Sequence, residues 1–74
     1  MDVAHEVEIR LKKNFPEGKW VIDFSDGQHM ALEISEAGFT GKTLVEQHKM
    51  VYTALDDLIK EGWLHALKLK TKIL

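Results

Sequence analysis

The sequence predicts a small α+β domain with the element order helix, strand, strand, helix, strand, in which the helices cover one face of a three-stranded mixed sheet. The chain has 74 residues, of which 45% are hydrophobic and 30% are charged, a composition that suits one small soluble domain. Apolar residues recur with a helical period near the start and in the centre of the chain, and with a period of two in three short runs. We therefore treat residues 1–74 as a single domain.

The first segment predicts an amphipathic helix. Charged residues occupy most of the positions between its apolar residues, and Asp2 precedes the run as the N-cap. Pro16 and Gly18 end the helix. Its apolar stripe consists of Val3, Val7, Leu11 and Phe15.

Two alternating runs follow and predict an antiparallel hairpin. Residues 20–24 and residues 30–34 each place large apolar side chains at every second position, as in half-buried strands. Between them, residues 25–28 read Ser-Asp-Gly-Gln, a sequence typical of a tight turn.

The central helix has the clearest boundaries. Thr43 and Glu46 have the spacing of a capping box, and Gly62 ends the helix. We expect one wide apolar stripe along it, formed by Leu44, His48, Val51, Leu55 and Leu58 and flanked by Val45, Tyr52 and Ile59. Within that stripe, we expect His48 to be a packed, hydrogen-bonded residue.

The helix between the second and third strands makes these strands parallel neighbours. The third strand places His65, Leu67 and Leu69 on one side and Ala66, Lys68 and Lys70 on the other. Parallel strands begin at the same end of a sheet. His29, which begins the second strand, and His65, which begins the third, should therefore lie close together.

This histidine pair suggests half of a metal coordination set. Neutral imidazole is a good ligand for iron, zinc or copper. The chain contains no cysteine, so a 2Fe–2S cluster, which needs four ligands, would require a partner that supplies thiolates. Spacing alone favours a structural alternative, in which His29 is a solvated turn residue and His65 bonds to backbone.

A second group of residues suggests nucleic-acid contact. Gly38 and Gly41 match the GxxG loop of KH domains, and Lys42 follows them. The lysines at 68, 70 and 72 line one face of the last strand. The structural alternative is that the glycines let the chain turn and that Lys68, Lys70 and Lys72 form a solvated face. The net charge of −2 predicts weak binding at most.

Other functions find little support in the sequence. The acidic residues include no pair in an enclosed site, so we expect no enzyme. No apolar run reaches the length of a membrane span, and the start of the chain lacks the pattern of a signal peptide. We expect a cytoplasmic protein with no membrane contact.

The chain resembles the BolA family over essentially its whole length, specifically in the C-terminal half and loosely before Ser25. The resemblance lies in the stretch from Phe39 to Leu55, which includes Phe-Thr-Gly and Gln-His-Lys-Met-Val-Tyr, and in the final His-Ala-Leu that starts at His65. The family shares the element order predicted above, and its fold resembles the KH type. Gln47 stands where the family usually has arginine.

The resemblance implies a partner and a cofactor. BolA-like proteins pair with monothiol glutaredoxins and share a bridged 2Fe–2S cluster, for which the glutaredoxin and glutathione give the thiolates. His65 matches the family's ligand on the final strand, and His29 is the candidate for its second ligand. Trp63 and Leu64, beside this site, would form part of the docking surface. The isolated chain, a monomer or weak dimer, would hold no cluster. The alternative function is a nucleic-acid-binding transcriptional regulator.

Overall fold

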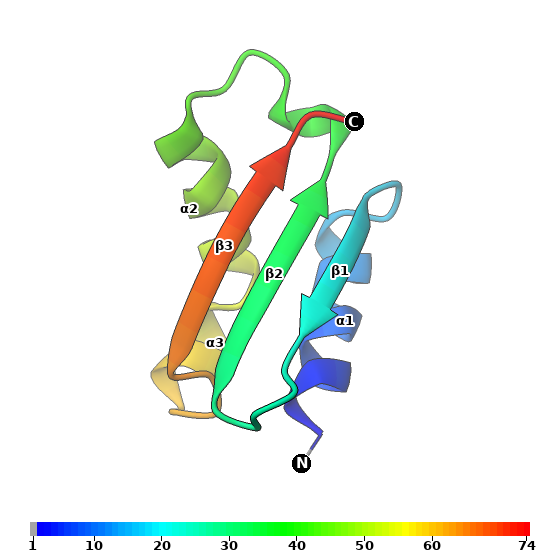
Figure 1. The fold of residues 1–74 in the computed structure, drawn as a ribbon. Coiled ribbons are helices and arrows are strands. Elements are labelled where there is room, and N and C mark those ends of the chain that lie inside the picture. Colours follow the sequence, from blue (N-terminus) through cyan, green and yellow to red (C-terminus); the bar gives the residue numbers. More distant parts are fainter. Residues whose placement is uncertain (1) are drawn as a thin grey trace.

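The structure is a computed structural model that describes residues 2–74 and shows a three-stranded sheet with helices behind one face (Figure 1). This confirms the predicted fold class. No helix among these residues is long and apolar enough to cross a membrane. The elements are α1 (Val3–Asn14), β1 (Lys19–Asp23), β2 (His29–Ser35), the short 3-10 helix η1 (Ala37–Phe39), α2 (Leu44–Ala54), α3 (Asp56–Lys60) and β3 (Ala66–Lys72).

The strands lie in the order β1-β2-β3, with β1 antiparallel to β2 and β2 parallel to β3. Both pairings are as predicted. In the parallel ladder His29 lies opposite Ala66, so β2 and β3 begin at the same level. Figure 1 shows this shared start beside the β1–β2 turn, at the opposite end of the sheet from the start of α2.

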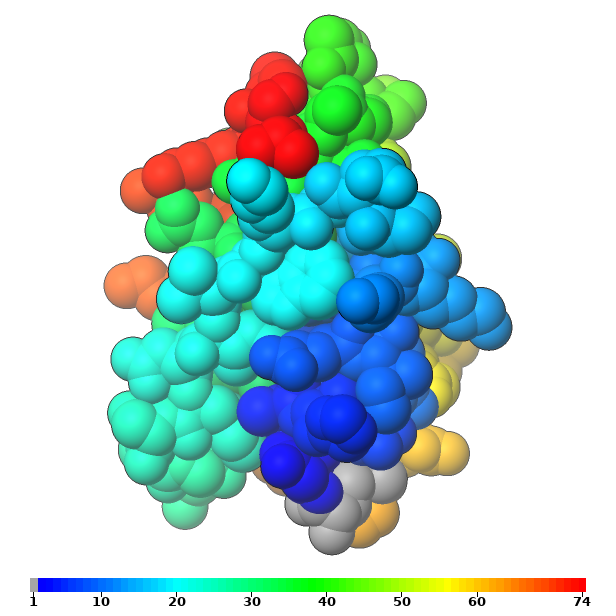
Figure 2. Space-filling model, turned by 90° about the vertical axis from the view of Figure 1, so that its right-hand side faces the viewer, coloured from blue at the N-terminus to red at the C-terminus, as the bar shows by residue number. Residues whose placement is uncertain are grey.

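The core lies between the sheet and the helices. β2 alternates strictly, with Met30, Leu32 and Ile34 buried and facing the helices. Figure 2 shows one side of the molecule, where the atoms of α1 (blue) lie against those of β1 (cyan). Each large apolar side chain that is fully buried adds about 1.5–3 kcal/mol to stability. The core comprises Val7, Leu11, Phe15, Met30, Leu32, Ile34, Phe39, Val51, Leu55, Leu58 and Leu64.

The predicted caps of both long helices are present. The Asp2 side chain accepts a hydrogen bond from the backbone N–H of His5 at 3.1 Å. Thr43 and Glu46 form the reciprocal capping box of α2, with bonds of 3.2 and 2.8 Å. These bonds satisfy backbone donors that a helix start otherwise leaves without partners.

The predicted apolar stripe of the central helix is wrong at its start. Leu44 and Val45 are 59% and 64% exposed, whereas Gln47 is only 8% exposed. The inward arc of α2, meaning the side of the helix that faces the core, begins at Gln47 because the amide of Gln47 is hydrogen-bonded there. The Thr71 hydroxyl donates to its Oε1 at 2.6 Å, and its Nε2 donates to the carbonyl of Lys42 at 3.0 Å. A buried amide with two hydrogen bonds costs little.

The central helix is also broken, where one continuous helix was predicted. Leu55 leaves helical geometry (φ −104°, ψ 7°), and α3 begins at Asp56. Asp56 and Asp57 form the first turn of α3, where acidic side chains favour a new helix start. Gly62, with φ +81°, ends α3 as predicted.

His48 differs from its predicted role as a hydrogen-bonded core residue. It is half-buried, and its Nε2 atom is buried without a hydrogen-bond partner among residues 2–74. The ring lies at the margin of the inward arc because that arc runs through Gln47 and Val51.

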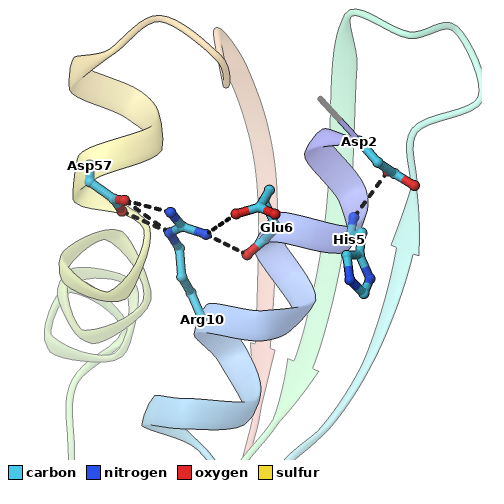
Figure 3. Close-up of polar contacts among 5 residues, drawn as sticks. All are labelled: Asp2, His5, Glu6, Arg10 and Asp57. Atoms are coloured by element: carbon cyan, nitrogen blue, oxygen red, sulfur yellow. Dashed lines mark hydrogen bonds and ion pairs between the residues drawn. The ribbon is translucent and has the colours of Figure 1, made fainter.

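Arg10 joins α1 to α3. Its guanidinium donates three bonds to the carboxylate of Asp57, from Nε to Oδ1 at 2.9 Å and to Oδ2 at 3.1 Å, and from Nη2 to Oδ2 at 2.6 Å (Figure 3). It also donates from Nη1 to Glu6 of its own helix at 3.0 Å. The hydrogen bond from Arg10 lowers the pKa of Asp57. Asp57 therefore favours the folded state when it is ionised.

Replacing Asp57 by asparagine should lower the midpoint of thermal unfolding at neutral pH by roughly 2–5 °C, as for other exposed ion pairs in small domains. Because the pKa of Asp57 is lowered in the folded state, this stabilisation is present above the ordinary carboxyl pKa of about 3.9 and is lost as the pH falls through the folded-state value. Melting curves of wild type and Asp57→Asn should converge on acidification.

The matched control for this experiment is Asp56→Asn. Asp56 pairs with Lys60 inside α3 at 2.9 Å, so its loss leaves the α1–α3 contact intact and should shift the midpoint less. A difference between wild type and Asp57→Asn that stayed constant from neutral to acidic pH would contradict the assignment.

Candidate functional site

The two histidines singled out in the sequence lie together at the start of the parallel strands. His29 begins β2, and His65 immediately precedes β3. With neighbouring residues they line one hollow of about 360 Å³. This confirms the predicted placement of the pair. The hollow is lined by Gly27, Gln28, His29, Trp63, His65 and Ala66.

The β1–β2 turn holds His29 through Asp26. One carboxylate oxygen of Asp26 accepts from the backbone N–H groups of Gln28 and His29, each at 2.8 Å. The other lies 2.8 Å from Nδ1 of the His29 ring. The backbone bonds, that from His29 first, are the main cause that lowers the pKa of Asp26 to about 2. Asp26 is therefore an anion at neutral pH.

A tight loop after α3 places His65. Gly62 has φ +81°, a left-handed conformation that glycine adopts without strain. The backbone N–H groups of Trp63 and Leu64 both bond to the carbonyl of Leu58, at 3.0 and 3.2 Å. A Cβ atom built on Gly62 would lie 3.9 Å from Cε1 of His65, so the imidazole lies close to this turn.

The structure separates the two residues that were predicted to form a docking surface. Trp63 is 46% exposed and lines the hollow with both histidines. Leu64 is 2% exposed and belongs to the core. The prediction for Leu64 is therefore wrong, because the side chain turns inward and anchors the loop instead of presenting apolar surface to a partner.

The donor set at the hollow fits part of a metal site. Residues 2–74 contain no group of three or more histidine, cysteine or acidic side chains placed to hold a metal ion. His29 and His65 could supply two neutral nitrogen ligands, which is half of what a 2Fe–2S cluster needs. Any cluster held here would require its other ligands from a second molecule.

The glycine loop, residues 38–41, lies at the other end of the sheet, after β2 (Figure 1). The backbone N–H of Gly38 donates to a carboxylate oxygen of Glu36 at 3.2 Å. Gly41 has φ +77° and turns the chain toward α2. The amide of Gly38 therefore already has an anionic acceptor, which works against phosphate binding and supports the structural alternative for these glycines.

The three lysines of β3 lie in a row on the sheet face that the helices leave open. Lys68, Lys70 and Lys72 are exposed, in alternation with half-buried residues. Lys72 pairs with Glu33 of β2 at 2.6 Å, and this hydrogen bond lowers the pKa of Glu33. Part of the basic charge is thus neutralised within the sheet.

Two residues near these sites were missed by sequence reasoning. Asp26 was treated only as part of a turn, although an Asp-Gly turn three residues before a histidine could have suggested a contact between the two side chains. Glu36 was assigned no role. Its contact with Gly38 depends on the path of η1, which the sequence does not show.

The fold and the site define a small α+β domain that presents two histidines and a tryptophan at one end of a mixed sheet. A family model described as BolA-like protein matches residues 4–73. The chain belongs to this family, as its resemblance predicted.

Individual relatives agree with this assignment. An uncharacterised protein of Rickettsia prowazekii is 43% identical over 70 residues, which cover 92% of this chain and 90% of that protein. The structure of BolA1 from Arabidopsis thaliana matches with a TM-score of 0.86 at 29% identity and covers 99% of this chain and 93% of that one. The BolA domain of SufE1 from the same plant gives a TM-score of 0.86 at 26% identity, with the same shares of the two chains covered.

We expect nucleic-acid binding to be weak and independent of the histidines. The net charge is −2, the amide of Gly38 is occupied and Lys72 is paired. Titration of a DNA duplex at two salt concentrations should give a dissociation constant of about 10⁻⁴–10⁻⁶ M at physiological salt. Lys42→Ala should weaken binding further, whereas His65→Ala should not change it. Tight, sequence-dependent binding at physiological salt would favour the transcriptional regulator instead.

Proposed function

We propose that this chain is a non-enzymatic adaptor that binds a monothiol glutaredoxin and shares a bridged 2Fe–2S cluster with it, in iron–sulfur trafficking or iron sensing. The observation that carries the proposal is that His29 and His65 line the same hollow in a chain without cysteine. Two imidazoles without thiolates are half of a cluster site. The glutaredoxin and glutathione would complete it.

The chemistry of the donors suits a shared cargo. His65 would be the first ligand from this chain and His29 the second. Imidazole is a neutral ligand, whereas a thiolate carries a negative charge, and replacing thiolates by histidines raises the reduction potential of such clusters. The chain would therefore contribute ligands that hold the cluster only alongside a thiolate-bearing partner.

Trp63 supports a protein partner at this place. Its side chain is 46% exposed beside both histidines, and partly exposed tryptophans are frequent anchors of protein interfaces. A BolA domain is also part of SufE1 in A. thaliana, which is in keeping with a module that works beside another domain. We place this activity in the cytoplasm.

The central test is to mix the purified chain with a cluster-loaded monothiol glutaredoxin and to record visible absorption and circular dichroism. Wild type should change the cluster spectrum, because imidazoles replace part of its ligand set. His65→Ala should abolish the change, and His29→Ala should weaken it at least tenfold. His5→Ala, at the start of α1, is the matched control. If His65→Ala changed the cluster spectrum as strongly as wild type does, the proposal would be contradicted.

A second prediction concerns the chain alone. Anaerobic reconstitution with iron and sulfide should yield no 2Fe–2S spectrum, because the sequence has no cysteine and residues 2–74 hold no group of three metal-binding side chains. Iron and sulfide analysis after gel filtration measures this. A stable cluster on the isolated chain would show that the ligand set assigned here is incomplete.

A further inference from the structure

We propose that Asp26 is a positioning residue that fixes the ring orientation and the tautomer of His29, so that Nε2 is the nitrogen left free for a ligand bond. The purpose of this arrangement rests on the proposed function. The arrangement itself belongs to the free chain and can be measured without a partner.

The two carboxylate oxygens of Asp26 have different hydrogen-bond partners. Oδ1 accepts from the backbone N–H groups of Gln28 and His29, at 2.8 Å each. These bonds fix the carboxylate relative to the turn. Oδ2 is then directed at Nδ1 of His29, also at 2.8 Å. The side chain of His29 is 69% exposed, so this contact, rather than packing, restrains its ring.

The contact also decides which nitrogen carries the proton. An ionised carboxylate only accepts hydrogen bonds, so Nδ1 must donate. In a neutral imidazole Nε2 then keeps its lone pair, which is the form that binds metals. A carboxylate behind a ligating histidine is a common device, because it orients the ring and strengthens the ligand.

The neighbouring carboxylate of Asp23 gives a matched comparison. Asp23 accepts from the backbone N–H of Ser25 at 3.1 Å, at the start of the same turn, and its contact is to backbone rather than to the ring of His29. Replacing it by asparagine removes the same charge from the same hairpin and leaves the contact between Asp26 and His29 in place.

Asp26→Asn is the decisive variant because it keeps the shape of the turn. The amide oxygen must stay on the two backbone N–H groups, which leaves the NH₂ group facing Nδ1 of His29. An N–H donor there requires a lone pair on Nδ1, so the neutral ring should move its proton to Nε2. The variant therefore reverses the tautomer while it retains the backbone bonds.

The first readout is the tautomer of His29 in the free chain, from long-range nitrogen–proton NMR spectra at about pH 8.5, where imidazole is ordinarily neutral. Wild type and Asp23→Asn should show the Nδ1–H form. Asp26→Asn should show the Nε2–H form, with the other three histidines unchanged. An identical His29 tautomer in wild type and Asp26→Asn would overturn the proposal.

The second readout is the spectrum of the complex with cluster-loaded glutaredoxin. Asp26→Asn should weaken formation of the shared cluster about tenfold, the lower end for loss of a partner to a ligating histidine, and Asp23→Asn should not. A switched tautomer with cluster sharing at wild-type strength would overturn the role of Asp26. A third outcome is that Asp26→Asn switches the tautomer but wild type itself shares no cluster with the glutaredoxin. That outcome would support the positioning of His29 by Asp26 and overturn the proposed function.

Discussion

The parallel ladder between β2 and β3 determines where every candidate functional side chain lies. A parallel pair needs a crossover, and α2 with α3 supplies it on one face of the sheet. His29 lies opposite Ala66, which brings the loop that carries His65 and Trp63 to the β1–β2 turn. A shift of one residue would exchange the two faces of β3 and would turn the exposed lysines toward the core. The buried positions of β2 therefore fix the core and the histidine site together.

A few polar contacts add to the apolar packing that holds the helices on this small core. Arg10 joins α1 to α3 through Asp57. Gln47 joins α2 to β3 through its hydrogen bond with Thr71. The first contact links two helices to each other, and the second links a helix to the sheet.

Much of this arrangement could be predicted because it depends on local patterns. The alternation in residues 30–34, the capping box at Thr43 and the helical crossover were enough to bring His29 and His65 together. What the sequence could not show depends on tertiary packing. In α2 the apolar Leu44 is exposed and the polar Gln47 is buried, which is the reverse of what hydrophobicity predicts. Gln47 can be buried because its amide has two hydrogen-bond partners that only the folded chain provides. Leu64 likewise turns inward because its loop folds back on Leu58.

The two ends of the sheet use carboxylates in opposite ways. At the start of β2, Asp26 contacts an imidazole and leaves that ring's second nitrogen available. Beyond the end of β2, Glu36 occupies the amide of Gly38 and places negative charge in the loop where a phosphate would have to approach. The start of β2 therefore presents a neutral nitrogen ligand, whereas the loop after β2 disfavours the binding of an anion. Because the two sites lie at opposite ends of a rigid ladder, a variant at one end should leave the chemistry of the other unchanged. The adaptor and nucleic-acid hypotheses can therefore be separated within a single set of purified proteins.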